Sequence, residues 1–301
     1  MKSLQEITAY YKGALHPKLL KLESQRKKIK KKVNTLFIPT VFVLLVIDFI
    51  IMIKSDFNFI FHLLFIIISA AISYSLLKQH FSKEYIKSFK TTVIKPLIHF
   101  IDPKLTYKPE KCVSKETYET SKIESREISN YNGSDFIYGN IDGINIKFSE
   151  LIISVKNKQE SDLATWGIFI AAEFPKHFKA HTLISTGSFR PTKGKKITMD
   201  SPLFNKKFTV YSTDEIEARY ILSPSLMENI LEYASALDYP LSLSFIGGNI
   251  YVSSNCGEIL EPSLQKSLLD MKILKSYALS LHFTISIVES LKLDVKLYSK
   301  Y

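Results

Sequence analysis

The sequence predicts an α+β protein with an N-terminal two-helix transmembrane hairpin, followed by a domain with an antiparallel sheet and packed helices. Two apolar runs, 33–53 and 57–77, are each 21 residues long and only three residues separate them. A helix of that length spans ~31 Å, about the thickness of the hydrocarbon core of a bilayer. From Phe136 onward, apolar and polar residues alternate between turn dipeptides, which predicts strands.

We expect four parts: a basic N-terminal segment (1–32), the transmembrane hairpin (33–77), a helical extension with a connector (78–135) and the α+β domain (136–301). The alternative for the two apolar runs is a buried hairpin inside a soluble core. That alternative must bury apolar side chains around the whole circumference of both helices, so the length and composition favour a membrane.

The net charge of +11 is concentrated beside the hairpin. Residues 1–32 carry +8, residues 33–77 carry −1 and residues 78–110 carry +4, whereas residues 111–301 are neutral. Lys and Arg flank the cytoplasmic ends of membrane spans, so both termini are expected in the cytoplasm. The basic flanks are also expected to contact anionic lipid headgroups of the bilayer, although a topology signal alone explains them. Because the domain itself is neutral, nucleic acid is not an expected partner.

Two ionisable residues, Asp48 and His62, lie inside the apolar runs. Each is five residues from the turn end of its run, so an antiparallel hairpin brings them to a similar depth. An ionisable residue within a span suggests proton or ion movement by default. The alternative, which we favour, is a polar pair whose members satisfy one another.

The flanking segments are expected to be helical as well. Gly13 and Pro17 divide the first 32 residues into two short helices, and Pro39 kinks the first span. Apolar residues at helical intervals carry the second helix beyond residue 77, until Pro96 interrupts or kinks it. Residues 102–135 are polar and are expected to form a connection with one short helix around 114–123.

Turn signals organise the domain. Asp142-Gly143 and Gly247-Gly248 each predict a hairpin turn. Ser212 and Glu215 stand at capping-box spacing for one helix, and Ser223 precedes Pro224 at the start of another. A last, charged helix is expected at 264–293, packed on the domain and not a third span. Strands are expected at 151–155, 165–173, 181–185, 206–213 and 241–254.

No catalytic signature is found. His177 and His181 stand four apart, but their context predicts a strand, where the rings would lie ~13 Å apart, so no metal site is expected. Cys256 lacks a local nucleophile motif and makes only a remote dyad with either histidine. No phosphate-binding or dinucleotide loop occurs, so catalytic residues are unknown and no cofactor is expected.

A basic loop in the domain is a further candidate site. It contains Arg190, Lys193, Lys195 and Lys196, which would suit a phosphate or an anionic lipid headgroup. The alternative is an ordinary solvated loop.

The densest motif occupies residues 206–231 and includes Tyr211, Asp214, Glu217, Arg219, Tyr220 and Pro224. Over this motif the sequence resembles a bacterial family known only as domain of unknown function three-one-three-seven. The resemblance implies two adjacent membrane helices followed by a cytoplasmic α+β domain, and therefore a location in the bacterial inner membrane. It implies no reaction, cofactor or catalytic residue. If Glu217 and Arg219 are buried and paired, we expect them to be structural supports of the motif.

The leading functional hypothesis is a non-enzymatic, membrane-tethered interaction or ligand-binding module with an unidentified protein partner. A neutral, strand-rich domain beside basic membrane flanks motivates it. The alternative is a membrane-anchored enzyme of unknown reaction. A third hypothesis is an oligomeric transport path through Asp48 and His62.

Overall fold

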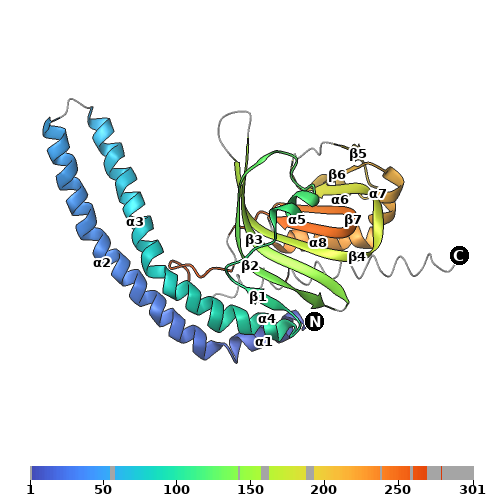
Figure 1. Cartoon of the computed structure of the whole chain (residues 1–301), viewed down its shortest axis with the longest axis horizontal. Coiled ribbons are helices and arrows are strands. Elements are labelled where there is room, and N and C mark those ends of the chain that lie inside the picture. Colours follow the sequence, from blue (N-terminus) through green and yellow to red (C-terminus); the bar gives the residue numbers. More distant parts are fainter. Residues whose placement is uncertain are drawn as a thin grey trace. The chain divides into compact units, whose positions relative to one another are not determined.

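The computed structural model describes residues 2–54, 58–141, 143–156, 163–187, 193–237, 239–257, 260–269 and 279. The chain divides into two compact units. Residues 10–96 and 261–271 form one, here called the helical unit, and residues 1–9, 97–260 and 272–301 form the other, here called the sheet unit. Figure 1 shows long helices in the first unit and a sheet in the second, which confirms the predicted α+β class.

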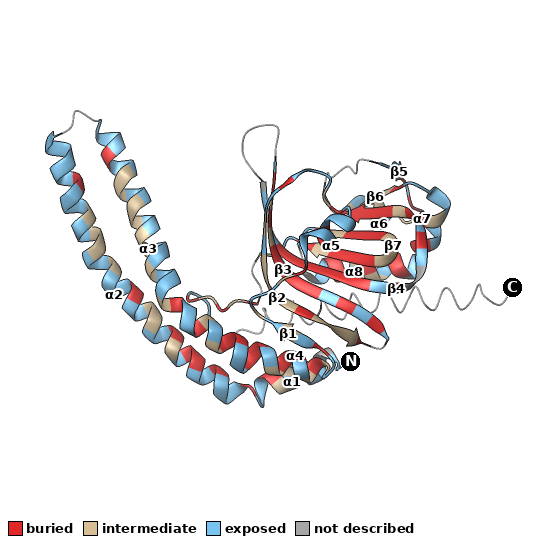
Figure 2. Cartoon of the chain, viewed as in Figure 1, coloured by how far each residue is buried: buried red, intermediate tan, exposed pale blue. Residues whose placement is uncertain are grey.

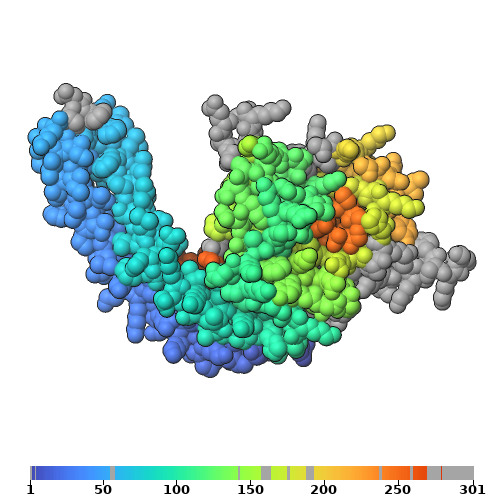
Figure 3. Space-filling view, in the orientation of Figure 1, coloured from blue at the N-terminus to red at the C-terminus, as the bar shows by residue number. Residues whose placement is uncertain are grey.

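Both apolar runs are helical. Helices α2 (His16–Lys54) and α3 (Phe59–Phe89) lie side by side (Figures 1 and 3). Each is long and apolar enough to cross a membrane, and only 6% of the residues in its most apolar window are buried. Figure 2 shows the same property as the pale blue of exposed residues along both helices. Apolar side chains that face outward on nearly every side favour a lipid environment over a soluble core.

The N-terminal segment is less divided than expected. Helix α1 (Leu4–Lys12) ends just before Gly13, as predicted. The expected second short helix is wrong, because α2 begins at His16 and continues for 39 residues through the basic segment into the apolar run. Pro17 lies in the first turn of α2, where its missing N–H group has no intrahelical partner to lose. The helix also continues through Pro39.

Helix α3 continues past the apolar run, as expected, and changes its winding before Pro96. The π-helix η1 (Lys90–Ile94) follows α3, and α4 (Lys95–Ile101) follows η1 without a break. Proline cannot donate a backbone hydrogen bond, and its ring crowds the carbonyl four residues earlier. A wider turn at this place accommodates that conflict, so Pro96 does not end the helix.

The chain returns to the helical unit after its last strand. Residues 261–269 belong to that unit and contain no helix, so the helix expected from residue 264 does not begin there. The remainder of 264–293 lies outside the described residues, apart from residue 279. Several side chains of the helical unit hold the returning segment. Among them, Tyr11 Oη donates to Leu268 O at 2.8 Å, and Arg26 Nη1 donates to Leu264 O at 2.5 Å.

The described strands form one antiparallel sheet of seven strands, with the path β1-β2-β3-β4-β6-β5 and β7 paired to β4. Strand β4 has 23 residues and is its centre. Its first half pairs with β3, its last residues pair with β6, and β7 pairs along both parts. The strands are β1 (Thr106–Lys108), β2 (Ile128–Ile141), β3 (Ile144–Val155), β4 (Leu163–Ser185), β5 (Lys195–Ile197), β6 (Thr209–Ser212) and β7 (Leu241–Ser254).

Several strand predictions are too short. The run 151–155 is part of β3, and the runs 165–173 and 181–185 are both parts of β4. Residues 102–135 are not only a connector, since they contain β1 and the first part of β2. The short helix predicted there is confirmed as α5 (Lys115–Thr120), with Ser114 as its N-cap.

Of the two hairpin turns predicted from glycine-containing dipeptides, one is confirmed and the other is wrong. The hairpin between β2 and β3 is confirmed, with Gly143 at φ 83°, whereas Asp142 lies outside the described residues. The second hairpin is wrong, because β7 is continuous through Gly247-Gly248. The pairing of β7 with β4 shifts register on both sides of the pair Phe178–Gly247, where Gly247 has φ 58°. Gly247 can adopt the positive φ that this irregularity within a long strand requires.

The helices of the sheet unit are α6 (Pro202–Lys207), α7 (Glu215–Ile221) and α8 (Pro224–Leu237). Lys206 and Lys207 are therefore helical and not in the expected strand. The expected capping residue Ser212 lies in β6, and Asp214 caps α7 instead. Ser223 precedes α8 as predicted, and its Oγ accepts from Leu226 N at 3.4 Å.

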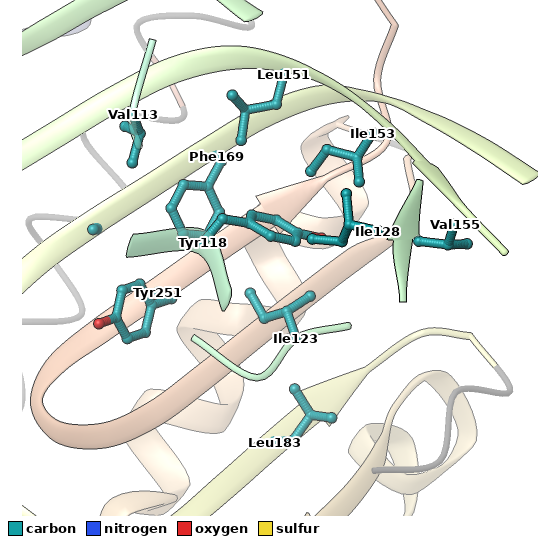
Figure 4. Close-up of a cluster of buried hydrophobic side chains, with 11 residues drawn as sticks. Val113, Tyr118, Ile123, Ile128, Leu151, Ile153, Val155, Phe169, Leu183 and Tyr251 are labelled. Atoms are coloured by element: carbon teal, nitrogen blue, oxygen red, sulfur yellow. The ribbon is translucent and has the colours of Figure 1, made fainter. Parts of the chain in front are cut away.

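A hydrophobic cluster lies between one face of the sheet and the segment around α5 (Figure 4). Tyr118 of α5 packs on Phe169 of β4, with ring centroids 5.0 Å apart. The segment that follows α5 contributes Ile123, which is also buried. Beyond this hydrophobic cluster, the side chains on the same face of the sheet are polar.

Candidate functional site

A row of polar side chains crosses four strands of the sheet unit. Asn140 of β2 is paired with Asn145 of β3, and Glu173 of β4 is paired with Asn249 of β7. Hydrogen bonds join three of them: Asn140 Nδ2 donates to Asn145 Oδ1 at 2.8 Å, and Asn145 Nδ2 donates to Glu173 Oε2 at 2.7 Å. Neighbouring strands lie ~4.8 Å apart, so the row extends over ~14 Å. We call Asn140, Asn145, Glu173 and Asn249 the polar row.

The β2–β3 turn fixes one end of the polar row. Gly143 N donates to Asn140 Oδ1 at 3.0 Å, so this side chain closes the turn as well as joining the row. The next row of the sheet along the strands contains Tyr138, Lys147 and Ala171. Ala171 is almost fully buried and belongs to the hydrophobic cluster, so the polar row begins where that cluster ends.

These two rows form the floor of a pocket of about 320 Å³. Thr117 of α5 is part of its wall, while its neighbour Tyr118 packs into the hydrophobic cluster. Helix α5 therefore lies at the boundary between the covered apolar part of the sheet face and the open polar part. The pocket is lined by Thr117, Tyr138, Gly139, Asn140, Asn145, Ile146, Lys147, Ala171, Glu173 and Asn249.

The pocket lining contains one positively charged and one negatively charged side chain. Lys147 and Glu173 line it, and the Glu173 carboxylate is already bonded to an asparagine amide. Beside the pocket, Lys108 Nζ lies 5.0 Å from the centre of the Tyr138 ring. A hydrogen bond from Lys108 lowers the pKa of the phenol of the half-buried Tyr138. The arrangement offers several donors and acceptors for binding, and a single carboxylate.

Sequence reasoning did not identify this pocket. The signal was present, because polar residues occupy alternate positions on both sides of the Asp142-Gly143 turn, in YGNIDGINIK. Alternation of that kind indicates a side-chain face. The partners Glu173 and Asn249 lie on strands far along the chain, and only the strand register reveals them.

The motif residues of 206–231 support the fold of the sheet unit. Asp214 caps α7, and its side chain accepts from Ile216 N and Glu217 N. Glu217 then reaches β4, where its carboxylate accepts from Lys179 N at 3.0 Å and Ala180 N at 2.6 Å. These amides belong to the stretch of β4 where the ladder with β7 is irregular. Glu217 therefore satisfies donors that the sheet leaves unpaired.

Glu217 and Arg219 are not paired with each other, and Arg219 is exposed, so the condition under which the two would support the motif as a pair is not met. Arg219 bonds Glu215 on its own helix, Asp200 Oδ1 at 3.2 Å and Thr198 O at 3.0 Å. It ties α7 to the segment after β5. Tyr211 pairs within the sheet, Tyr220 is 44% exposed and Pro224 begins α8.

The two ionisable candidates within the apolar runs, Asp48 and His62, do come together. His62 Nδ1 lies 2.9 Å from Asp48 Oδ1, and both residues are buried between α2 and α3. A polar pair that is satisfied in this way joins the two helices at one depth. The geometry agrees with the favoured interpretation of mutual satisfaction.

The other candidates are dispersed. Lys193, Lys195 and Lys196 are exposed at or near edge strand β5, and Arg190 lies outside the described residues. His177 is exposed on β4, whereas His181 is half-buried on the same strand and lies 3.0 Å from Ser244 Oγ. Burial raises the pKa of the Cys256 thiol to about 11, so at neutral pH it is protonated and a poor nucleophile.

Comparison with known proteins supports the resemblance. The family described as "Protein of unknown function (DUF3137)" matches residues 166–293, which include the whole motif. No curated protein matches the chain significantly. The crystal structure of the mycobacterial trehalose monomycolate transport factor A, TtfA, is similar at 12% identity and a TM-score of 0.35, over 62% of this chain and 85% of that chain. A TM-score of that size does not establish a shared fold.

Proposed function

We propose that this chain is a multi-pass protein of the bacterial inner membrane that holds a small-molecule binding module on the cytoplasmic side. The observation that carries the proposal is the pocket, which combines the polar row with the rigid register of four strands. Binding sites are usually largely pre-formed and use a few well-placed polar groups. Strand pairing and the hydrogen bonds within the polar row place its side chains in that way.

The membrane part of the proposal is supported by α2 and α3, which are long and apolar enough to span a bilayer. The +8 charge of residues 1–32 and the +4 charge of residues 78–110 favour cytoplasmic termini. The same residues suit the anionic headgroups of the inner leaflet, where each basic side chain adds about 1 kcal/mol of attraction. The exposed Lys193, Lys195 and Lys196 suit such headgroups too.

A module of this kind reports or relays the occupancy of its site, so a protein partner is part of the proposal. The membrane-anchored enzyme remains the second candidate function. The pocket contributes one carboxylate, Glu173, which is hydrogen bonded to Asn145. General acid–base catalysis by a pair of side chains needs a second ionisable group close to the same substrate atom. Binding is therefore the function that this geometry supports better.

The test compares two variants on the same helix. Thr117→Trp places a large side chain in the pocket wall, whereas Thr120→Trp places it on the exposed side of α5, outside the pocket. Full-length protein in nanodiscs is incubated with a bacterial metabolite extract, and retained small molecules are identified by mass spectrometry.

We expect at least one molecule to be retained by the natural protein and by Thr120→Trp, but not by Thr117→Trp. Identical retention by all three proteins would refute the pocket as the site. Chemical conversion of the retained molecule on continued incubation would favour the enzyme.

A further inference from the structure

We propose that the pocket takes an uncharged polyhydroxylated ligand, such as a sugar or a cyclitol, a proposal that rests on the binding function proposed above. The feature that carries it is the mixed hydrogen-bonding character of the polar row together with the balanced charge of the pocket.

The polar row offers donors and acceptors side by side. An asparagine amide has two N–H donors and an oxygen with two lone pairs. Asn140 uses one donor for Asn145 and one lone pair for Gly143, and Asn145 uses one donor for Glu173 and one lone pair for Asn140. Each amide therefore retains capacity of both kinds. A hydroxyl group both donates and accepts, so a ligand with several hydroxyls can bond at every position of such a row.

The bonds within the row also fix its orientation. Because Glu173 accepts from Asn145 Nδ2, the Asn145 oxygen is turned toward Asn140, and the two amides cannot rotate without losing a bond. Side chains that are held in this way lose little conformational freedom when a ligand binds. The row is thus pre-organised for a ligand whose polar groups follow a repeated spacing, as the hydroxyls of a sugar ring do.

The charges of the pocket disfavour an ion. A phosphate or carboxylate near Lys147 would also lie near the Glu173 carboxylate, and an amine near Glu173 would also lie near Lys147. An ion that enters must give up hydration and meet a charge of its own sign. An uncharged ligand avoids that repulsion, and it can accept from Lys147 and donate to Glu173 at the same time.

The size of the pocket limits the ligand. A volume of about 320 Å³ is at the lower end of the range for small-molecule sites, which suits one or two rings. The ring of Tyr138, which lines the pocket, is already stacked on Phe136 at 5.0 Å and has Lys108 Nζ 5.0 Å from its centre. Recognition therefore depends on the polar row more than on aromatic stacking.

The experiment uses three probes that share one ring and differ in charge: glucose, glucose 6-phosphate and glucosamine. Myo-inositol and maltose serve as further neutral probes. Binding to the full-length protein is measured by ligand-observed saturation-transfer NMR in nanodiscs prepared without sugar-based detergent. The variant is Asn145→Leu, which interrupts the polar row. The matched control is Asn132→Leu, which removes an exposed asparagine that bonds Asn130 on the same sheet, outside the pocket.

We expect a neutral probe to bind more tightly than both charged relatives of glucose. Asn145→Leu should weaken that binding about tenfold or more, because it removes hydrogen bonds at the centre of the row, while Asn132→Leu leaves it unchanged. Binding of only the phosphate or only the amine, or no neutral probe sensitive to Asn145→Leu, would overturn the ligand class. The proposed binding function would survive that result if Thr117→Trp still abolished retention of a metabolite, and it would fail if Thr117→Trp had no effect there.

Discussion

At the scale of single residues, the backbone contacts of Glu217 show why the motif at 206–231 needs a glutamate at this position. Its two carboxylate oxygens each accept one backbone N–H group of β4, from Lys179 and Ala180. Neutral Gln has one acceptor oxygen and turns an NH₂ group toward the second amide. The charge and the second acceptor are both needed at this irregular point of the sheet.

We therefore expect Glu217→Gln to lower the free energy of unfolding of the sheet unit by about 1.5–3 kcal/mol. Glu215→Gln is the matched control, because Glu215 is exposed and its ion pair is with the likewise exposed Arg219, and its effect should stay within about 0.5 kcal/mol. Urea unfolding can be followed by the fluorescence of Trp166, the single tryptophan, which lies in β4. Equal effects of the two changes would contradict this role of Glu217.

His181 is the residue whose protonation the fold opposes. Burial, and then the nearby Lys122, lower the pKa of His181 from 6.5 to about 4. Ser244 Oγ donates its single hydrogen to Ser121 O at 2.5 Å, so the ring Nε2 must be the donor toward Ser244. The ring is therefore neutral in the folded protein and protonated on Nε2.

The sign of the pH dependence follows from the lowered pKa. Between pH 6.5 and pH 4 the unfolded chain binds a proton at His181 and the folded chain does not, so the stability of the sheet unit falls as the pH falls through this window. His181→Gln keeps a donor toward Ser244 without titrating and should flatten the curve. His177→Gln, at an exposed histidine, should leave it unchanged. Urea titrations at several pH values measure the stability of both variants. If the stability of His181→Gln fell with pH as steeply as that of the natural protein, His181 would not be the group responsible.

At the scale of elements, the returning segment 261–269 is held to the helical unit through a buried ion pair. Arg26 Nη2 bonds Glu23 Oε1 at 2.6 Å, and Glu23 Oε2 also accepts from Leu268 N at 3.1 Å. Arg26 in turn donates to Leu264 O. The pair thus fixes the backbone of the segment at two points, one through each of its members.

Arg26→Met should release this segment, because it leaves the Glu23 carboxylate buried without its counter-charge, at a cost of about 3–5 kcal/mol. We expect trypsin to cleave after the exposed Lys266 faster than in the natural protein. The double change Glu23→Leu and Arg26→Met removes both charges and should restore part of the protection. Lys2→Met, which breaks the exposed pair with Glu6, is the control and should change nothing. Equal cleavage of the single and double variants would argue against the pair as the holding element.

At the scale of the whole molecule, the charge distribution predicts the membrane topology. The basic flanks adjoin the far ends of both apolar runs, and the short turn between them contains only Lys54. The positive-inside rule then places the turn outside and both termini in the cytoplasm.

Cysteine labelling tests that orientation. In a chain with Cys112 and Cys256 replaced by Ser, a cysteine introduced by Ser55→Cys should react with a membrane-impermeant maleimide added to spheroplasts. A cysteine introduced by Ser114→Cys should react only after lysis. The reverse pattern would invert the topology, and reaction at both sites in intact spheroplasts would exclude a membrane hairpin.

Local patterns determined much of this protein without reference to its tertiary structure. The lengths of the apolar runs, the break at Gly13, the short helix around 114–123 and the Asp142-Gly143 turn depend on residues close together in the sequence, and the structure agrees with each of them. The Asp48–His62 pair was also predictable, because an antiparallel hairpin brings residues equally far from its turn to a similar depth.

The tertiary structure decided the features that depend on strands far apart in the sequence. Gly247-Gly248 has the composition of a turn, yet β7 continues through it because β4 pairs with both of its halves. The polar row likewise exists only because register aligns Asn140 and Asn145 with Glu173 and Asn249. Propensity and periodicity act over a few residues, whereas long-range pairing is chosen by the total free energy of the sheet, so the pocket was not visible until the strands were in place.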